Sequence, residues 1–164
     1  MRIAMFVDGN NLFYTMKSLG WRIDYRKMLS FASNGGQVVD AYYFASYSDN
    51  DNQGQFINTL SYMGYSCVIK PTVKDKDGND VKANMDLEMG SAILLSMHLY
   101  DKAILVTGDG DFECIVKILR DNGKDCDVLS ASVSMSRQFR NMLGLHYTDI
   151  GEHRDMFELV FESD

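Results

Sequence analysis

The sequence lacks the usual marks of secreted, membrane-spanning and zinc-binding proteins. Its three cysteines are widely spaced and form no CxxC pair, so neither a disulfide framework nor a zinc site is indicated. No segment approaches the ~20 consecutive apolar residues of a membrane helix. Only Arg2 is basic before the first apolar run, and no small-residue cleavage site follows. We therefore expect a cytoplasmic protein without a signal peptide or a membrane partner.

Basic residues are also scarce. The 164 residues include 16 Lys and Arg against 23 Asp and Glu, for a net charge of −7. Because affinity for phosphate comes mostly from Lys and Arg, this balance argues against a pure nucleic-acid-binding module. It remains compatible with an enzyme whose acidic residues gather around a cation. The length suits one domain with a proper hydrophobic core, spanning residues 1–164.

Several catalytic and binding motifs are missing. The sequence contains no GxGxxG, GxxxxGK[ST] or GxSxG pattern, which excludes the common phosphate loops and the nucleophile elbow. Asp75, Asp77 and Asn79 are spaced like the first ligands of a calcium loop. However, Gly78 stands in the fourth position of that loop, where the sixth is required, so we reject an EF-hand.

Apolar runs that favour strands alternate with segments of helical periodicity. Strands are expected at 3–7, 38–47, 65–70, 103–106, 126–129 and 146–150. Helices are expected at about 11–19, 24–34, 53–63, 85–99, 111–121, 134–143 and 154–161. A polar turn around Asp77 and Gly78 predicts a hairpin between two further short strands. This alternation is typical of a doubly wound, mostly parallel sheet in an α/β fold.

Four aspartates occupy the ends of these elements. Asp8 follows the first strand, Asp109 and Asp111 follow the strand at 103–106, and Asp86 begins an apolar helix. In an open α/β sheet the carboxyl ends of parallel strands face one crevice. Carboxylates gathered there repel one another unless a cation binds, and their oxygens suit Mg²⁺ or Mn²⁺. The pattern predicts metal-dependent chemistry on a phosphate substrate.

Each acidic turn also has an ordinary structural explanation. Asp-Gly and Asn are common turn and helix-capping residues, and a carboxylate at the start of a helix, such as Asp86, is favoured by the helix dipole. The coincidence of two acidic turns after the two most apolar strands is what favours a shared pocket.

Three segments, at residues 7–11, 82–86 and 107–112, resemble the acidic motifs of the NYN domain, in the PIN-like nuclease group that includes the LabA proteins. The order and spacing match over roughly residues 1–150. The resemblance implies a PIN-like three-layer α/β/α sandwich and a metal-dependent ribonuclease site. Its catalytic and metal-binding residues would be Asp8, Asp86, Asp109 and Asp111. Asn11 and Thr107 would be polar helpers near the metal or the phosphate.

The chain departs from the family pattern at Ala92. Many relatives carry a further Asp about six residues beyond the one that matches Asp86. The loss of a carboxylate here implies weaker metal binding, or one firmly held ion in the absence of substrate.

The resulting hypothesis is hydrolysis of RNA phosphodiester bonds with Mg²⁺ or Mn²⁺, one ion held by Asp8, Asp86 and Asp109 and a second near Asp111. Lys82, Arg137 and Arg140 are candidate substrate-binding residues. Two alternatives stay open: an RNA-binding or regulatory module with little turnover, and an enzyme acting on a small phosphate ester. Eleven methionines and a tyrosine-rich middle would supply a homodimer surface if they were exposed.

Overall fold

The computed structural model describes residues 1–48 and 53–161, in which six parallel strands form the central sheet. Their order is β3-β2-β1-β6-β7-β8. The strands are β1 (Arg2–Asp8), β2 (Gln37–Tyr47), β3 (Ser66–Pro71), β6 (Lys102–Val106), β7 (Asp125–Ser130) and β8 (Tyr147–Asp149). The chain runs outward from β1 in one direction and then in the other, so β1 and β6 are the adjacent central strands. This confirms the predicted parallel, doubly wound sheet.

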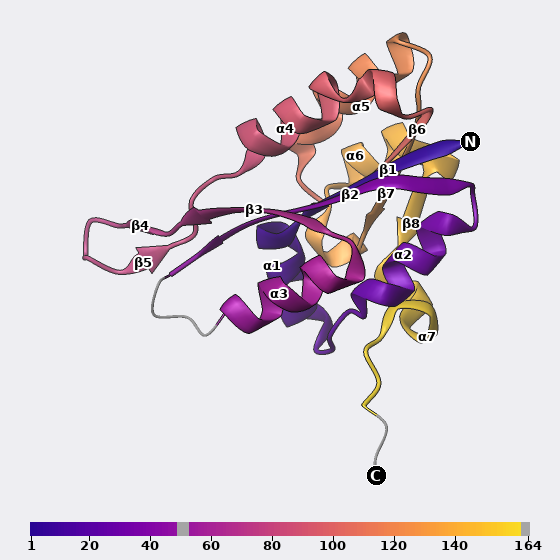
Figure 1. Cartoon of the computed structure of the whole chain (residues 1–164). Coiled ribbons are helices and arrows are strands. Elements are labelled where there is room, and N and C mark those ends of the chain that lie inside the picture. The colour runs from indigo at the N-terminus through magenta and orange to yellow at the C-terminus, as the bar shows by residue number, and fades with distance from the viewer. Residues whose placement is uncertain (49–52, 162–164) are drawn as a thin grey trace.

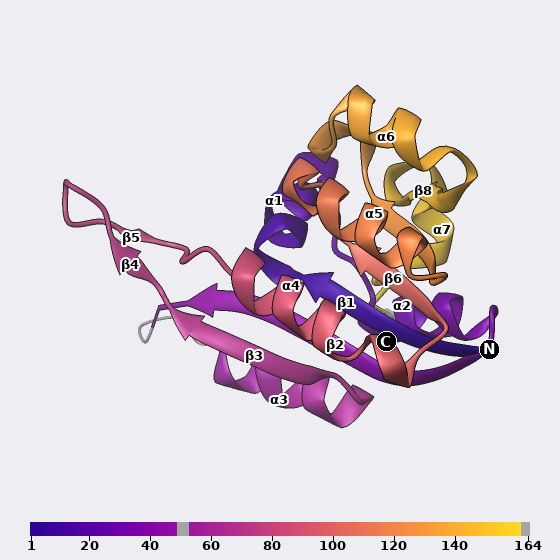
Figure 2. The same cartoon turned by 90° about the horizontal axis from the view of Figure 1, so that it is seen from above.

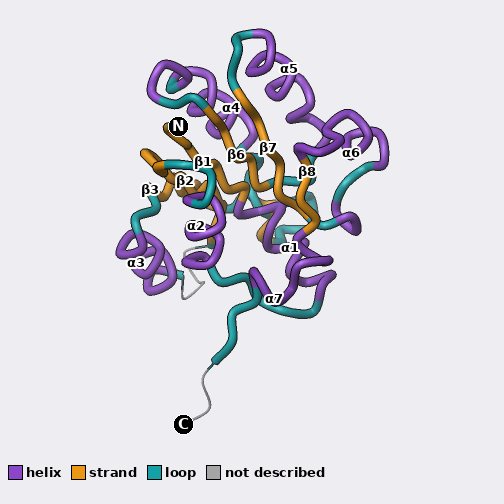
Figure 3. Tube along the Cα trace, turned by 90° about the vertical axis from the view of Figure 1, so that its right-hand side faces the viewer, coloured by secondary structure: helices purple, strands orange, loops and turns teal. Residues whose placement is uncertain are grey.

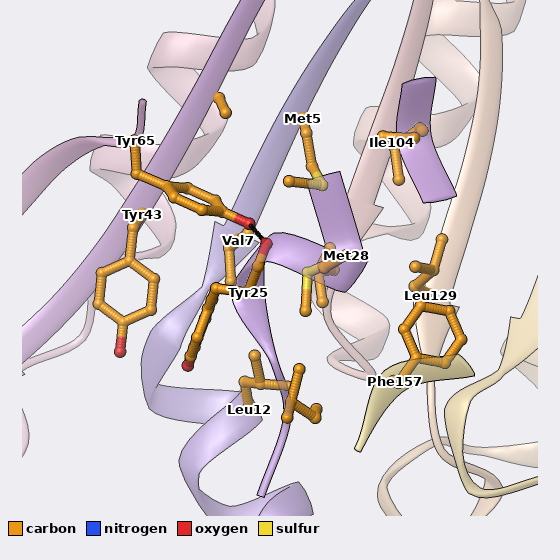
Figure 4. Packing of buried hydrophobic residues seen from close by; sticks show 14 of the residues in the cluster. Met5, Val7, Leu12, Tyr25, Met28, Tyr43, Tyr65, Ile104, Leu129 and Phe157 are labelled. Atoms are coloured by element: carbon orange, nitrogen blue, oxygen red, sulfur yellow. Dashed lines mark hydrogen bonds between the residues drawn. The ribbon is translucent and has the colours of Figure 1, made fainter. Parts of the chain in front are cut away.

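Helices cover both faces of this sheet (Figures 1 and 3). They are α1 (Gly9–Leu19), α2 (Tyr25–Ser33), α3 (Gly54–Met63), α4 (Asp86–Leu95), α5 (Glu113–Asp121), α6 (Arg137–Leu143) and α7 (Arg154–Phe157). Alternate residues of β1 point to opposite faces. Met5 and Val7 pack with α1, α2, α3 and α7 (Figure 4). Phe6 packs with α4, α5 and α6. The predicted three-layer α/β/α sandwich is therefore confirmed.

A small antiparallel hairpin extends from the body of the molecule (Figure 2). It consists of β4 (Val73–Lys74) and β5 (Asp80–Val81), joined by the turn that the Asp-Gly pair predicted. The segment that follows β5 leads directly into α4.

Several predicted boundaries differ from the observed ones. The helix expected at 85–99 ends at Leu95 and is followed by a 3₁₀ turn, Met97–Leu99. The helix expected at 111–121 begins with the 3₁₀ turn Gly110–Phe112. Pro71, expected to stop β3 before it, is the last residue of that strand. A proline is tolerated there because β3 is an edge strand and needs no outward N–H.

Two C-terminal helices are shorter than predicted. Helix α6 begins only at Arg137, because the side chain of Ser136 accepts a hydrogen bond from the N–H of Phe139 and caps it. Helix α7 ends at Phe157, because the next residues pair with the segment before α2: Leu159 N–H donates to the carbonyl of Arg22. In the described part of the chain, no helix is long and apolar enough to cross a membrane.

We expect the substitution Leu105→Ala, in the middle of β6, to lower the free energy of unfolding by about 2–5 kcal/mol, because it leaves a cavity under a fully buried side chain. Leu95→Ala is the matched control: this leucine is 78% exposed at the end of α4, and its loss should change stability by less than about 0.5 kcal/mol. Urea denaturation of both variants measures the difference. Equal losses would contradict the layer arrangement.

Candidate metal centre

The acidic residues predicted from the sequence meet at the carboxyl end of the central strands. Because β1 pairs with β6, Asp8 at the end of β1 lies beside the loop that follows Val106. This loop carries Asp109 and Asp111, and Asp86 is the first residue of α4. Carboxylate oxygens of Asp86, Asp109 and Asp111 all lie within 4.8 Å of one another. Three side chains from distant parts of the chain thus form one acidic group.

Local hydrogen bonds hold two of these carboxylates. Asp86 Oδ2 accepts a hydrogen bond from Asn84 Nδ2 at 3.1 Å, and the backbone N–H of Asp86 donates to Asn84 Oδ1 at 2.7 Å. Asp109 Oδ1 accepts from the N–H of Asp111 at 2.9 Å, which caps the 3₁₀ turn. Each contact turns the chain so that the neighbouring acid lies close by.

Asp8 occupies a different position from the other three. It is 6% exposed, and it is not a member of the group within 4.8 Å. Its Oδ1 accepts a hydrogen bond from the N–H of Asn11 at 3.0 Å, which caps α1, and its Oδ2 accepts one from the Thr107 hydroxyl at 2.8 Å. The carboxylate is therefore buried and fixed in orientation.

Burial and mutual repulsion disfavour charge at this site. The pKa of Asp8 is raised to about 6. Burial is the largest cause, the charges of Asp86 and Asp109 add to the rise, and the two hydrogen bonds of Asp8 oppose it. Burial also raises the pKa of Asp86, and the neighbouring Asp109 and Asp111 add to that rise. A bound cation would relieve both costs. Two oxygens on opposite sides of one Mg²⁺ lie about 4.2 Å apart, so the 4.8 Å spread fits a hard divalent cation.

Asn11 and Thr107 connect the acidic elements to each other. The Thr107 hydroxyl donates to Asp8 and accepts from the N–H of Asp109 at 3.2 Å. Asn11 Oδ1 accepts from the N–H of Gly108 at 2.9 Å, which ties α1 to the loop after β6. These two residues, expected to help bind metal or phosphate, position the carboxylates in this structure.

The loop passes so close to its neighbours that residue 108 must be glycine. A Cβ atom at Gly108 would lie 2.3 Å from the carbonyl oxygen of Ser134 and 2.7 Å from Ser130 Oγ. Both distances are shorter than van der Waals contact. Any larger residue would displace the segment that carries Asp109.

Asn10 lies in the first acidic turn, where the sequence explains Asn as a turn or helix-capping residue. The structure shows a larger role for it. Its Oδ1 accepts from the N–H of Ser46 at the end of β2, and its Nδ2 donates to the carbonyl of Ala83, both at 2.9 Å. The fully buried hydroxyl of Ser46 accepts from the N–H of Ala83 at 2.8 Å. These bonds hold the segment that leads to Asp86 against the sheet. The two adjacent amides Asn10 and Asn11, directly after Asp8 and Gly9, were the available signal.

The predicted basic residues are distributed over two regions. Lys82 Nζ donates to the carbonyl of Ser46 at 3.0 Å and lies 4.8 Å and 4.9 Å from the ring centres of Phe13 and Tyr47. Arg140, in contrast, is half-buried near Tyr147 at the start of β8, where its charge lowers the pKa of that hydroxyl, although burial of Tyr147 dominates and raises it.

The two arginines of α6 are not among the described contacts of the acidic group. Arg137 is exposed in the first turn of the helix. Among the contacts of the described residues, neither Arg137 nor Arg140 pairs with Asp86, Asp109 or Asp111. Their role in substrate binding stays a prediction.

Comparison with known proteins identifies the family of this chain. The model of the NYN domain matches residues 2–150. The chain belongs to the NYN domain family. It is 31% identical to "Low amplitude and bright protein LabA" of Synechococcus elongatus, over 96% of this chain and 88% of that protein. A Vibrio parahaemolyticus protein of unknown function is 26% identical in sequence to this chain. Its crystal structure superimposes on this structure with a TM-score of 0.79, over 96% of each chain. The three segments that resemble NYN motifs, at residues 7–11, 82–86 and 107–112, carry the four aspartates.

We expect Asp8→Asn to stabilise the metal-free protein at pH 7. The pKa of this acid is higher in the folded state, about 6, than its ordinary value of 3.8, so its charged form costs stability above pH 6 and that cost disappears as the pH falls toward 4. The shift corresponds to at most about 3 kcal/mol. Urea denaturation in EDTA at pH 5 and pH 7 should show a difference between variant and wild type that shrinks at pH 5.

Asp121→Asn, on the exposed end of α5, controls for the loss of one negative charge. It should leave the pH dependence of stability unchanged. An Asp8→Asn protein that is less stable than wild type at pH 7 would contradict the prediction, because it would show that the charged form of Asp8 does not destabilise the fold.

Proposed function

We propose that this NYN protein is a metal-dependent ribonuclease that hydrolyses RNA phosphodiester bonds with Mg²⁺ or Mn²⁺. The observation that carries the proposal is the group of three carboxylates within 4.8 Å, with the buried Asp8 behind it, at the end of the central strands. Membership of the NYN family, a PIN-like nuclease family, supports the same chemistry.

Asp86, Asp109 and Asp111 would hold the cation, since their oxygens converge and carboxylates are its preferred ligands. A divalent cation bound to such a site lowers the pKa of water and offsets charge on phosphate oxygens. The protein's own contribution is orientation. Thr107 and Asn11 fix the relative positions of β1, α1 and the loop after β6, so the acidic side chains need no large rearrangement before substrate binds.

Asp8 contributes charge from behind the site. One hydrogen bond to each of its oxygens keeps the carboxylate in a single orientation, and its burial makes its charge act at close to full strength on the group in front. A positive charge near these carboxylates, from the cation or from a basic residue that contacts the substrate, would lower the pKa of Asp8 and keep it ionised at neutral pH.

A second candidate function is an RNA-binding or regulatory module with little turnover. It is favoured by Ala92, which packs against the apolar cluster under α4 where many relatives carry another Asp. Within this alternative, the ion pairs of Lys70 with Glu88 and of Lys74 with Asp80 favour a regulatory role over RNA binding, because they leave less positive charge for a phosphate backbone.

We expect purified protein to cleave labelled single-stranded RNA with Mn²⁺ and not with EDTA. Asp86→Asn should lower the rate about 100-fold or more, because the loss of a metal ligand removes several kcal/mol of transition-state stabilisation. Asp121→Asn, prepared in the same way, should retain the wild-type rate. The Asp86→Asn preparation also exposes contaminating nucleases, because their activity would persist in it.

The outcomes separate the candidate functions. Equal cleavage by wild type and Asp86→Asn would contradict the proposal. Binding of RNA with no metal-dependent cleavage would favour the module. Release of phosphate from mononucleotides in place of RNA cleavage would favour a small phosphate ester as substrate.

A further inference from the structure

A large open pocket lies between α1, the end of β2 and β5. Its volume is about 1020 Å³. Of the 17 described residues that line it, seven are aromatic, three are basic and one is acidic. The lining therefore combines apolar ring faces with groups that attract an anion.

The inner wall of this pocket carries tyrosine hydroxyls. Tyr43 and Tyr47 share a hydrogen bond of 2.8 Å between their hydroxyls. Tyr25 is 6% exposed, and its hydroxyl, beside that of Tyr43, makes no hydrogen bond of standard geometry in the described structure. In Figure 4 the hydroxyls of Tyr25 and Tyr43 point the same way. Because buried polar groups normally have partners, this hydroxyl is suited to a ligand with a polar edge.

The mouth of the pocket carries exposed rings and cations. Phe13 and Tyr14 on α1 are 43% and 55% exposed, and their rings pack edge to face. Lys82 and Lys17 place their ammonium groups 4.8 Å and 5.9 Å from the Phe13 ring. Because both ammonium groups lie over this ring, a planar group that stacked on Phe13 would take the place of one of them and stay close to the other.

We propose that this pocket binds a base of single-stranded RNA next to the nucleotide whose phosphodiester lies at the carboxylates; the inference rests on the proposed ribonuclease function. Aromatic faces for stacking and basic groups for the backbone are the features by which proteins bind single strands. In a duplex, bases are stacked against one another and cannot enter such a pocket.

The pocket and the acidic group are built on the same two segments. Phe13 is five residues beyond Asp8 on α1, and Lys82 is four residues before Asp86, a reach of at most about 14 Å. Asn10 joins these segments by its hydrogen bond to Ala83. A single-stranded RNA whose phosphodiester lies at the carboxylates can therefore extend to the pocket.

The sole tryptophan provides a local reporter, because Trp21 lines the pocket. Titration of the metal-free protein in EDTA with a short single-stranded oligouridylate should change Trp21 emission in parallel with fluorescence anisotropy of the labelled RNA. Phe13→Ala should weaken binding about tenfold or more, since stacking on an aromatic ring contributes on that scale. Tyr62→Ala removes a 93% exposed ring on α3 outside the pocket, and should bind as wild type does.

Binding that is unchanged in Phe13→Ala, or that leaves Trp21 emission unchanged, would overturn the inference. Equal affinity for a duplex of the same length would also overturn it. In cleavage assays, Phe13→Ala should raise KM and leave kcat nearly unchanged. Metal-dependent cleavage with an unaltered KM would reject the pocket alone. Binding that depends on Phe13 without any cleavage would reject the ribonuclease and keep the pocket.

Discussion

The burial of carboxylates at one edge of a parallel sheet, with their mutual repulsion added to it, opposes folding, and the rest of the structure must offset it. Burial raises the pKa of Asp8 to about 6, and its acidic neighbours raise the pKa of both Asp8 and Asp86. Folding must therefore supply the free energy to bring Asp86, Asp109 and Asp111 within 4.8 Å of one another. The buried core on both faces of the sheet supplies it, and the fixed ends of β1 and β6 prevent the acids from separating. Such a site is costly when empty and favourable when a cation occupies it.

The hydrogen bonds around the site explain how the acids are held. Thr107 binds Asp8 through its hydroxyl and receives the N–H of Asp109, so one side chain connects the two strand ends. Asn10 and Asn11 act in the same way from the first turn of α1, one toward the segment before α4 and the other toward Gly108. The amides next to Asp8 thus have a structural role distinct from that of the acids. Helix α1 also carries Phe13, which lines the pocket, so the same helix contributes to the acidic group and to the candidate base-binding surface.

Much of this architecture could be predicted from local sequence, and the remainder depended on contacts between distant segments. The apolar runs at 3–7 and 103–106 indicated the central strands, because short uninterrupted apolar runs are typical of strands buried on both faces. The apolar strands predicted that Asp8 and Asp109 would lie at the same edge of the sheet, whereas the closer grouping of Asp86, Asp109 and Asp111 without Asp8 has no local signal. Helix α7 was predicted too long, since its pairing with the segment at Arg22 has no local signal. The bridging role of Asn10 and the steric need for Gly108 were likewise invisible, because both depend on atoms from Ser46, Ala83 and Ser134.

The central claim is that one pocket of carboxylates holds a divalent cation. Anomalous diffraction from crystals soaked in Mn²⁺ tests it most directly, since the manganese signal locates the ion without reference to activity. The account predicts a peak within coordination distance of carboxylate oxygens of Asp86, Asp109 and Asp111, which disappears in crystals of Asp109→Asn. Manganese bound only at other surface acids, with these three carboxylates lacking a peak at saturating concentration, would contradict it.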